Sequence, residues 1–536
     1  MKIVVADKIS ERGVELLRQP GWNVALPTPA ALPAELGEAE GLIVRSATRV
    51  TAELLERAPR LRVVGRAGVG VDNIDTEAAT LRGVLVMNTP GSNSVSVAEH
   101  TIALLLSLAR GVPQLNAALH AGRWEKSSAG VELRGKTLGL VGLGRVGAEV
   151  ARRARGLEMR VVAHDPFITA EYARETSVEL LAFDELLAQS DIVSLHLALS
   201  PATENLFDAA ALARMKPGAR LINTARGELI DEAALAEALR SGRLAGAALD
   251  VFAMEPPRQS PLLELANVIA TPHVAGSTQE AQEEVGVLIA QQVRDYLAEG
   301  VLRNAVNLPT LSAEQYRRVR PWLELAARLG AMVAQIRPGP MQRVRITYAG
   351  EPGQLGTSVL RNAVLAGALN TVLEHKVNLV NAAAVAGKRR IVIEELTRRR
   401  ERGFPDTLEV AIRNDEASCE LAGEGTVLHG ATPRVLSLDG IDLEAPLEGV
   451  MLFTRNRDVP GVIGAIGTTL GRLGVNIATF ALGRREAVPG AEAIALVRVD
   501  GDVPEGALSE LRAIPALTEA RVVRLPAAMQ FSTARA

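Results

Sequence analysis

The sequence predicts an α/β protein: a doubly wound, parallel region followed by two smaller mixed domains. From Met1 to Gly300, short β-branched runs alternate with helical patterns rich in Ala and Leu. The runs are continuously apolar rather than alternating, which indicates strands buried on both faces, as in parallel sheets. The pattern changes after Asn307, and the C-terminal part has the order of a small β-α-β-β-α-β unit.

The expected strands of the parallel region form two series, on either side of an amphipathic helix over residues 96–110. The first series is KIVVAD, GLIVRS, LRVVGRAG and GVLVMN, and the second is TLGLVGLG, MRVVAHD, DIVSLHL, ARLINTA, GAALDVF and NVIATPH. A further helix is expected from Gln279 to Glu299, where Gly300 ends it. The segment RNAVNLP that follows is interpreted as a linker.

Two mixed segments are expected beyond this linker. The first extends to about Glu448. The second begins with the strand GVMLFTRN and a Pro-Gly pair, continues with a helix, and adds the strands GVNIATFALGR and AEAIALVRVD. The terminal MQFSTARA has no pattern and is expected to be loose.

Composition limits the classes of partner. A chain of 536 residues is too long for one core, so three or four domains are expected. A hydrophobic content of 48% and a charged content of 23% are ordinary for globular proteins. The net charge of -3 gives no electrostatic footprint for nucleic acid or for an anionic membrane, so neither is expected as a partner. Local Arg and Lys side chains must therefore hold any anionic substrate.

The cysteine content and the N-terminus indicate a reducing compartment. Cys419 is the one cysteine, so neither an intramolecular disulfide nor a cysteine-based metal site is expected. MKIVVADKIS lacks the basic start and the apolar run of a signal peptide. No stretch approaches ~20 uninterrupted apolar residues. A soluble, cytoplasmic protein without a metal is the default expectation.

The strongest local motif is the G-x-G-x-x-G run from Gly142 to Gly147, which follows the strand TLGLV and opens a helix. Gly142 permits the tight turn, Gly144 lets the backbone approach a pyrophosphate, and Gly147 lets the helix pack closely on the strand. The helix N-terminus offers free N–H groups to phosphates. Asp165, at the end of the next strand, can accept hydrogen bonds from ribose hydroxyls and would repel a 2′-phosphate. The motif therefore predicts NAD rather than NADP.

A second group of side chains, Arg226, Glu255 and His273, follows three expected strands. Ligands bind at the carboxyl ends of strands in open parallel sheets. Oxidising a 2-hydroxy acid needs a base that takes the hydroxyl proton as hydride leaves the same carbon, and His273 suits this role. Glu255 beside the imidazole would orient it and favour its protonated form. Arg226 offers a planar, bidentate fork for the substrate carboxylate and 2-oxo group.

Each of these residues also has a structural interpretation. A lone histidine is more often structural than catalytic, and Arg226 could be a surface residue. His196, in the strand SLHLAL, is interpreted as a packed or loop-anchoring histidine. Spacing alone does not show that the three side chains converge.

Residues from about 40 to 310 resemble the D-isomer-specific 2-hydroxy acid dehydrogenase family. The segments that match are GRAGVGVDNID, NTPGSNSVSVAEHTIALLL, GLGRVG, NTARGELID, ALDVFAMEPP and TPHVAGST. The resemblance implies two Rossmann-like lobes with a cleft between them, and it implies that Arg226, Glu255 and His273 are the catalytic set. It also implies that the helix after Asn93 is part of a dimer interface.

The rest of the chain resembles the added domains of long-form 3-phosphoglycerate dehydrogenases. VNLVNAAAVAGKRRI is similar to their intervening domain, and RNRDVPGVIGAIGTTLGRLGVNIATFALGR resembles a ferredoxin-like ACT regulatory domain. The implied domains are a discontinuous substrate-binding lobe at 1–97 and 286–307, an NAD-binding Rossmann domain at 98–285, an intervening α/β domain at 312–446 and an ACT domain at 449–527.

The implied activity is NAD-dependent oxidation of 3-phosphoglycerate to 3-phosphohydroxypyruvate, the first step of L-serine biosynthesis. The residues expected at the cofactor are Gly142, Gly144, Arg145, Val146, Gly147, Asp165, Ala225, Asp250 and Gly276. Because the substrate is charged at both ends, further cations are expected to bind it, from the set Arg45, Arg66, Arg123 and Lys126. The last two could equally be surface charges.

The ACT resemblance also implies an effector, L-serine, with Asp458 and Asn476 as candidate ligands, although the loop at 455–461 could equally be a plain turn. A homodimer or homotetramer is expected. Two other functions stay open. One is a dehydrogenase of another D-2-hydroxy acid, such as a hydroxypyruvate or glyoxylate reductase, which the two added domains disfavour. The other is a non-catalytic NAD-sensing scaffold, which the complete Arg/Glu/His set disfavours.

Overall fold

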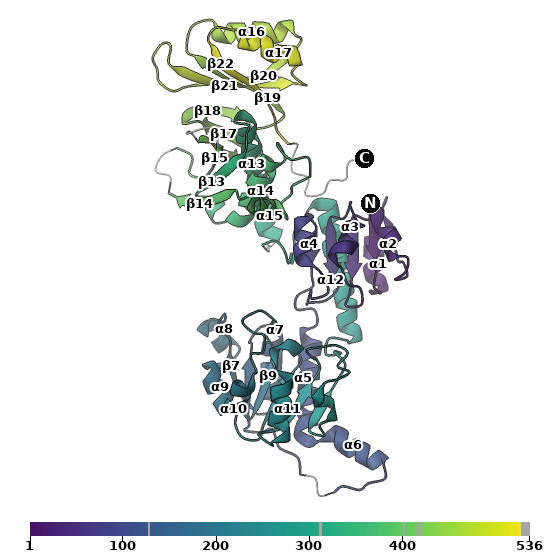
Figure 1. The fold of residues 1–536 in the computed structure, drawn as a ribbon. Coiled ribbons are helices and arrows are strands. Elements are labelled where there is room, and N and C mark those ends of the chain that lie inside the picture. Colours follow the sequence, from purple (N-terminus) through teal and green to yellow (C-terminus); the bar gives the residue numbers. More distant parts are fainter. Residues whose placement is uncertain (127–128, 310–312, 400–402, 415–419, 527–536) are drawn as a thin grey trace. The chain divides into compact units, whose positions relative to one another are not determined.

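The computed structural model describes residues 1–126, 129–309, 313–399, 403–414 and 420–526, so Cys419 and the terminal MQFSTARA lie outside the described residues. The chain divides into two compact units, Met1–Thr89 with Gly286–Ala536, and Pro90–Val285. Four sheets form in the described part of the chain (Figure 1). Two of these sheets are wholly parallel and the other two contain antiparallel pairs, which confirms the predicted α/β fold class.

The first unit opens with a parallel sheet in the order β2-β1-β3-β4-β5. Its elements are β1 (Lys2–Val5), α1 (Glu11–Leu17), β2 (Asn23–Ala25), α2 (Leu32–Glu35), β3 (Gly41–Val44), α3 (Ala52–Glu56), β4 (Val63–Arg66), α4 (Thr76–Leu81) and β5 (Leu85–Met87). The edge strand β2 was not predicted, because three residues are too few to show a periodicity.

Helix α12 (Gln279–Glu299) has the bounds predicted from the sequence, and its later turns pack on this sheet. Glycines on the strands allow the close approach. A Cβ atom on Gly65 would lie 2.7 Å from Val293 Cγ2, and one on Gly41 would lie 3.2 Å from Leu297 Cδ1. Val293 and Leu297 are fully buried. The sheet of the first lobe is thus completed by a helix more than two hundred residues away in sequence.

The segment after α12 joins two domains, as predicted, but it is also hydrogen-bonded to β5. Ala305 forms an antiparallel bridge with Met87. Asn307 accepts a hydrogen bond from the Val86 N–H through Oδ1 (2.9 Å) and donates to the Val84 carbonyl through Nδ2 (2.9 Å). Composition alone could not reveal this attachment, because it depends on the free edge of β5.

The second unit is built on a seven-stranded parallel sheet in the order β12-β11-β10-β9-β6-β7-β8. Its elements are α5 (Ser94–Arg110), α6 (Val112–His120), β6 (Thr137–Val141), α7 (Arg145–Gly156), β7 (Arg160–His164), α8 (Ala170–Glu175), β8 (Glu179–Leu180), α9 (Phe183–Gln189), β9 (Ile192–Leu195), α10 (Ala209–Arg214), β10 (Ala219–Asn223), α11 (Glu232–Arg240), β11 (Leu244–Leu249) and β12 (Val268–Ala270). The strand order reverses between β6 and β9, and ligands bind at such a switch point.

Helices cover both faces of the seven-stranded sheet (Figure 1). One apolar cluster joins α5 and α7 to the sheet, and another joins α9, α10 and α11 to it. Burial from both sides explains why the strands read as continuous apolar runs. Helix α5 begins two residues before the predicted start and ends at Gly111, whose φ of 61° stops the helix in the left-handed conformation.

The next domain of the first unit has a six-stranded sheet in the order β14-β13-β15-β16-β17-β18, in which the β13–β14 pair is parallel and the other pairs are antiparallel. Its elements are α13 (Ala313–Ile336), β13 (Met341–Ala349), α14 (Thr357–Leu369), α15 (Ala382–Lys388), β14 (Val392–Arg398), β15 (Thr407–Asn414), β16 (Leu421–Leu428), β17 (Thr432–Leu438) and β18 (Ile441–Pro446). Helices α13 and α14 touch backbone to backbone, since a Cβ atom on Gly367 would lie 2.0 Å from the Ala327 carbonyl oxygen.

The C-terminal domain has the predicted β-α-β-β-α-β order. Its elements are β19 (Val450–Arg457), α16 (Val462–Arg472), β20 (Asn476–Arg484), β21 (Glu492–Asp500), α17 (Glu505–Arg512) and β22 (Leu517–Arg524). The four strands are antiparallel in the order β20-β21-β19-β22, and an apolar cluster that includes Leu452, Ile466 and Leu511 joins the two helices to the sheet. This arrangement confirms the ferredoxin-like prediction.

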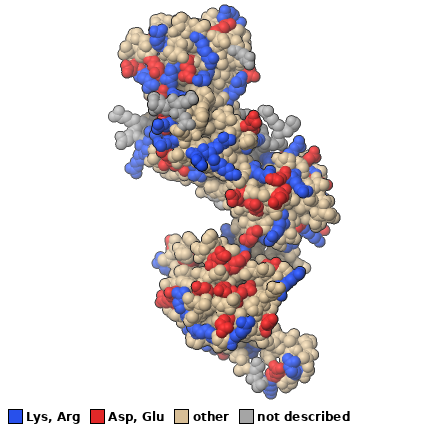
Figure 2. All heavy atoms as spheres, viewed as in Figure 1, with Lys and Arg blue, Asp and Glu red and all other residues tan. Residues whose placement is uncertain are grey.

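The surface charge and the length of the apolar helices bear on possible partners. Acidic and basic side chains are interspersed over the visible face of the molecule (Figure 2). In the part of the chain that the structure describes, no single helix is long and apolar enough to cross a membrane; α5 and α6 reach the length and composition only as a pair bent by 64°.

Candidate active site

The glycine loop joins β6 to α7 at the switch point of the seven-stranded sheet. Gly142 has a φ of 99°, and a Cβ atom there would lie 2.5 Å from the His196 carbonyl oxygen. A Cβ atom on Gly147 would lie 2.3 Å from the Gly142 carbonyl oxygen, whereas no described atom lies within 4 Å of the corresponding position on Gly144. Packing therefore demands glycine at 142 and 147, and the open space beside Gly144 is available to a ligand.

The start of α7 presents backbone donors without a side-chain cap. Gly144 is the N-cap residue and makes no side-chain hydrogen bond, so the first N–H groups of a twelve-residue helix are available to an anion. Arg145 lies in the first turn, and its guanidinium donates to the Pro90 carbonyl oxygen. Val146 is half-buried beside the loop. These positions fit the phosphates of a dinucleotide.

Asp165 lies at the end of β7 and is hydrogen-bonded to the glycine loop. Its Oδ2 accepts from the Leu143 N–H and its Oδ1 from the Phe167 N–H, both at 2.9 Å. Each carboxylate oxygen keeps a second lone pair for a ribose hydroxyl. Phe167, which the sequence interpretation did not identify, is 92% exposed on the same loop. Its signal was an aromatic residue in the Asp-Pro-Phe turn.

His196, at the end of β9, is a packed histidine as predicted. Its Nε2 lies 2.9 Å from Ser194 Oγ, and burial lowers the pKa of its ring to about 3. A histidine that stays neutral and hydrogen-bonded within the fold is a poor proton acceptor.

The three candidate catalytic residues follow the neighbouring strands β10, β11 and β12. His273 Nδ1 lies 2.8 Å from Glu255 Oε2, so these two side chains form a pair. The loops of Arg226 and Glu255 are in contact, because a Cβ atom on Gly227 would lie only 1.9 Å from the Phe252 carbonyl carbon. The parallel sheet thus brings these loops together at the carboxyl ends of its strands.

The loop of Arg226 is shaped by its own hydrogen bonds. Asn223 accepts from the Ala225 N–H (2.9 Å) and donates to the Arg226 carbonyl (2.7 Å). Arg226 Nη1 donates to the Ala225 carbonyl oxygen at 2.7 Å. Ala225, a predicted cofactor residue, is thereby held half-buried beside the guanidinium.

The loop of His273 is built around the buried carboxylate of Asp250. Asp250 Oδ1 accepts from the Val274 N–H (2.9 Å) and Oδ2 from the Ala275 N–H (2.8 Å), while the Asp250 carbonyl accepts from the His273 N–H (2.8 Å). Burial alone would raise the pKa of Asp250, but hydrogen bonds to its carboxylate outweigh burial and lower that pKa. His273 itself has a φ of 52°, in the left-handed region. Gly276 follows in the same loop, where a Cβ atom would lie 2.8 Å from Asn93 Nδ2.

Helix α5 supplies side chains to these loops that the sequence interpretation missed. Thr101 Oγ1 lies 2.9 Å from Thr224 Oγ1, beside the Arg226 loop. His100 Nε2 lies 3.1 Å from Thr271 Oγ1, in the His273 loop. Their signal was a short polar run, Glu99 to Thr101, directly before the apolar stretch IALLL of the helix.

Arg45 and Arg66, the candidate phosphate ligands of the first lobe, follow or end the adjacent strands β3 and β4. Val44 is in register with Arg66, so the two arginines lie together at the carboxyl ends of these strands. The Arg45 backbone N–H donates to Asp7 Oδ2 at 2.6 Å. A Cβ atom on Gly68 would lie 1.6 Å from Arg66 Nη1, so this glycine is needed where the guanidinium folds over the loop.

Arg123 and Lys126 lie on the loop after α6, in the other unit, and both are exposed. Arg123 Nε donates to Glu125 Oε1 at 2.9 Å. Among the described residues of the unit that contains them, no hydrogen bond or ion pair joins either cation to the catalytic loops.

The two candidate effector ligands both have partners within the C-terminal domain. Asp458 Oδ2 pairs with Arg484 Nε at 3.1 Å, and Asn476 Nδ2 donates to Asp500 Oδ2 at 2.7 Å. The strand registers place these pairs at opposite ends of the sheet. One chain alone therefore does not bring Asp458 and Asn476 together. Asn456 was missed: it is 2% exposed, and among the described residues its Oδ1 has no hydrogen-bond partner.

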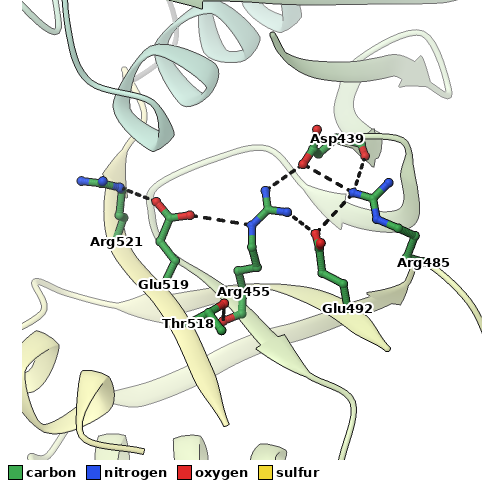
Figure 3. A network of polar contacts seen from close by, with 7 residues as sticks. All are labelled: Asp439, Arg455, Arg485, Glu492, Thr518, Glu519 and Arg521. Carbon is green, nitrogen blue, oxygen red and sulfur yellow. Dashed lines mark hydrogen bonds and ion pairs between the residues drawn. The ribbon is translucent and has the colours of Figure 1, made fainter. Parts of the chain in front are cut away.

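A network of ion pairs connects the C-terminal sheet to the turn between β17 and β18 (Figure 3). Arg455 pairs with Asp439 Oδ2 (2.8 Å), with Glu492 and with Glu519 Oε2 (3.7 Å). Arg485 bridges Asp439 and Glu492 from the other side. Burial would lower the pKa of Arg455, but the three carboxylates outweigh burial and raise it.

Comparisons with known proteins agree with this architecture. Residues 102–275 match the D-isomer specific 2-hydroxyacid dehydrogenase, NAD binding domain; residues 318–439 match the D-3-phosphoglycerate dehydrogenase intervening domain; and residues 450–516 match the ACT domain. A D-3-phosphoglycerate dehydrogenase from Methanocaldococcus jannaschii is 39% identical over 98% of this chain and 100% of its own length, and one from Bacillus subtilis is 38% identical over the same shares.

Solved structures match a little over half of this chain. The TT0316 protein from Thermus thermophilus has 38% sequence identity and a TM-score of 0.53, covering 57% of this chain and 100% of its own. An NAD-dependent formate dehydrogenase from Staphylococcus aureus, in complex with NAD, has 30% identity and a TM-score of 0.52, covering 58% of this chain and 100% of its own.

These matches confirm the predicted NAD cofactor and the predicted oxidoreductase class. Three domain models match successive parts of the chain in the predicted order, and relatives near 40% identity align with 98% of it. The chain belongs to the D-3-phosphoglycerate dehydrogenase family.

Proposed function

We propose that the protein oxidises 3-phospho-D-glycerate to 3-phosphohydroxypyruvate with NAD, as the first step of L-serine biosynthesis. The observation that carries the chemistry is the His273–Glu255 pair at 2.8 Å, next to the loop of Arg226. The phosphorylated substrate is supported by relatives of full length that are named D-3-phosphoglycerate dehydrogenase. When bound, NAD accepts the hydride from the substrate's C2.

The side chains divide the rest of the reaction among them. Glu255 accepts the Nδ1–H of His273, which leaves the Nε2 lone pair to take the hydroxyl proton. The resulting imidazolium is stabilised by the same carboxylate. Arg226 holds the substrate carboxylate and polarises the forming 2-oxo group through its planar fork. Asp165 and the start of α7 hold the cofactor's ribose and phosphates.

A substrate panel tests this function. Initial rates of NADH formation would be compared for 3-phosphoglycerate, glycerate, lactate and glycolate, and the reverse rates for hydroxypyruvate and glyoxylate. His273→Ala is expected to lower kcat by ~10²–10⁴-fold. A faster reaction with unphosphorylated acids would favour the hydroxypyruvate or glyoxylate reductase alternative. Absence of turnover on every acid, with NAD bound, would favour the scaffold.

We assign the substrate phosphate first to Arg45 and Arg66. This assignment is supported by their position at the carboxyl ends of the adjacent strands β3 and β4, whereas only charge and exposure support Arg123 and Lys126. Arg66→Ala should weaken binding of 3-phosphoglycerate much more than binding of glycerate, while the exposed Arg57→Ala should change neither. Equal losses for both acids would make Arg66 structural.

We further propose that L-serine binds the C-terminal domain and lowers activity. Asp458 and Asn476 remain the candidate ligands, and Asn456 joins them because its buried amide oxygen has no hydrogen-bond partner among the described residues. As the two ends of one sheet are far apart, a shared site needs two copies of the domain side by side. Calorimetry with L-serine on wild type and Asn476→Ala tests this; no heat at millimolar serine, with unchanged rates, would reduce the domain to an assembly module.

A homodimer or homotetramer in the cytoplasm completes the proposal. Large apolar side chains are exposed on and after α5 and α6, namely Val95, Leu106, Val112, Leu119 and Trp124, as is common where subunits meet. Light scattering on wild type and Leu119→Glu measures the assembly, and an unchanged mass would exclude this face. The proposed cytoplasmic location is supported by the single cysteine of the chain.

A further inference from the structure

The carboxylate of Asp250 is fully buried and organises the loop that carries His273. It accepts the backbone N–H groups of Val274 and Ala275, the two residues that follow His273 in the chain. A buried carboxylate that keeps its charge needs several hydrogen-bond donors, because each oxygen lone pair without a donor adds to the free-energy cost of burying the charge. One further donor, the hydroxyl of Thr271, reaches it from a side chain, and this hydroxyl is itself contacted by His100 of helix α5.

The direction of these side-chain hydrogen bonds can be deduced. Thr271 Oγ1 donates its one proton to Asp250 Oδ1 at 2.6 Å. Its oxygen must therefore accept from His100 Nε2, which lies 3.1 Å away. His100 Nε2 is also 3.5 Å from Asp250 Oδ1. The chain of donors thus runs from His100 through Thr271 to Asp250 and needs no charge on the imidazole of His100.

We infer that His100 is a positioning residue, which holds the Thr271–Asp250 hydrogen bond and through it the orientation of the loop that presents His273. This inference rests on the proposed function, because it takes His273 to be the catalytic base. His100 does not touch the reacting atoms. Its effect should therefore appear in turnover and in the order of the loop, not in cofactor binding.

The size of the effect follows from geometry. A catalytic group must be held to about 0.5 Å, and a displacement of about 1 Å can cost ~10²-fold in rate. Loss of His100 leaves three donors on Asp250, so the loop should loosen rather than collapse. A decrease in kcat on the order of tenfold is expected.

The test compares His100→Leu, His100→Gln and Thr271→Val in the full chain. Leu removes the donor, whereas the Nε2 of Gln can replace the Nε2 of His. His100→Leu should lower kcat about tenfold and leave the KM for NAD within about twofold, and His100→Gln should recover most of kcat. Amide hydrogen exchange at Val274 and Ala275 should be faster in His100→Leu than in His100→Gln. The exposed His375→Leu, in the turn after α14, is the matched control.

A relay makes a further demand. Because His100 acts through Thr271, the double variant His100→Leu/Thr271→Val should be little worse than either single variant. Additive losses would overturn the relay, as would a kcat of His100→Leu within about twofold of wild type or unchanged exchange at Val274 and Ala275. Hydrogen exchange needs no substrate. If 3-phosphoglycerate proved not to be the substrate, the exchange rates would still test the role of His100, so the two failures can be told apart.

Discussion

Replacing Glu255 by Gln tests whether the orientation of His273 matters for turnover. Glu255 accepts two hydrogen bonds, from the His273 Nδ1–H through Oε2 (2.8 Å) and from the Phe252 N–H through Oε1 (3.2 Å). An amide has only one acceptor oxygen. If that oxygen faces His273, the amide NH2 opposes the N–H of Phe252. If it faces Phe252, the NH2 donates to Nδ1, and the proton moves to Nε2, where the base is needed.

The magnitude can be worked from these two orientations. Leaving the N–H of Phe252, a residue only 5% exposed, without an acceptor costs about 1–3 kcal/mol, or about 5- to 150-fold in the share of the active orientation. The side chain of Glu255 is 39% exposed, so water relieves part of this cost and favours the lower end of that range. We therefore expect kcat to decrease about 5- to 20-fold, with the KM for NAD nearly unchanged.

Initial rates of NADH formation at saturating substrate measure the effect. Glu264→Gln, an exposed residue in the stretch before β12, is the matched control for loss of one negative charge. Turnover of Glu255→Gln within twofold of wild type would refute the reasoning, because it would mean that neither the tautomer nor the orientation of His273 limits the reaction. A large loss that appears only in KM would place Glu255 in substrate binding instead.

Three further perturbations have defined outcomes. Asp165→Ala should chiefly raise the KM for NAD, since it removes the ribose acceptor and also frees the glycine loop; an unchanged KM would refute the cofactor assignment. Gly147→Val should abolish NAD binding or folding, as seen by calorimetry and circular dichroism, because a Cβ atom there would lie 2.3 Å from the carbonyl oxygen of Gly142. Arg455→Met should lower the free energy of unfolding, measured by denaturant titration, by about 2 kcal/mol. Breaking a fully buried ion pair costs ~3–5 kcal/mol. The Arg455 side chain is only 17% exposed, but its three carboxylate partners are more exposed, so a smaller loss is expected.

Local patterns were enough to predict much of the fold. The strands of both parallel sheets read as apolar runs because helices bury them from two sides, and α12 was predicted with its observed bounds because Gly300 ends it. The glycine loop and Asp165 were also predictable, since the motif needs only a strand, a turn and a helix that are consecutive in sequence. The β-α-β-β-α-β order of the last domain follows from the same local alternation.

The tertiary structure decided which distant residues meet. Glu255 and His273 pair because β11 and β12 are neighbours in the sheet, which no spacing in the sequence reveals. Asp458, predicted as an effector ligand, is paired with Arg484, because the registers of β19 and β20 on β21, rather than any motif, bring the two together. His100 likewise lies among other polar residues of an amphipathic helix, and no local pattern shows that it reaches the His273 loop. The sequence by itself determined the elements and the chemistry that they carry, whereas hydrogen-bond register and helix packing, which join residues far apart in the chain, determined how that chemistry is assembled.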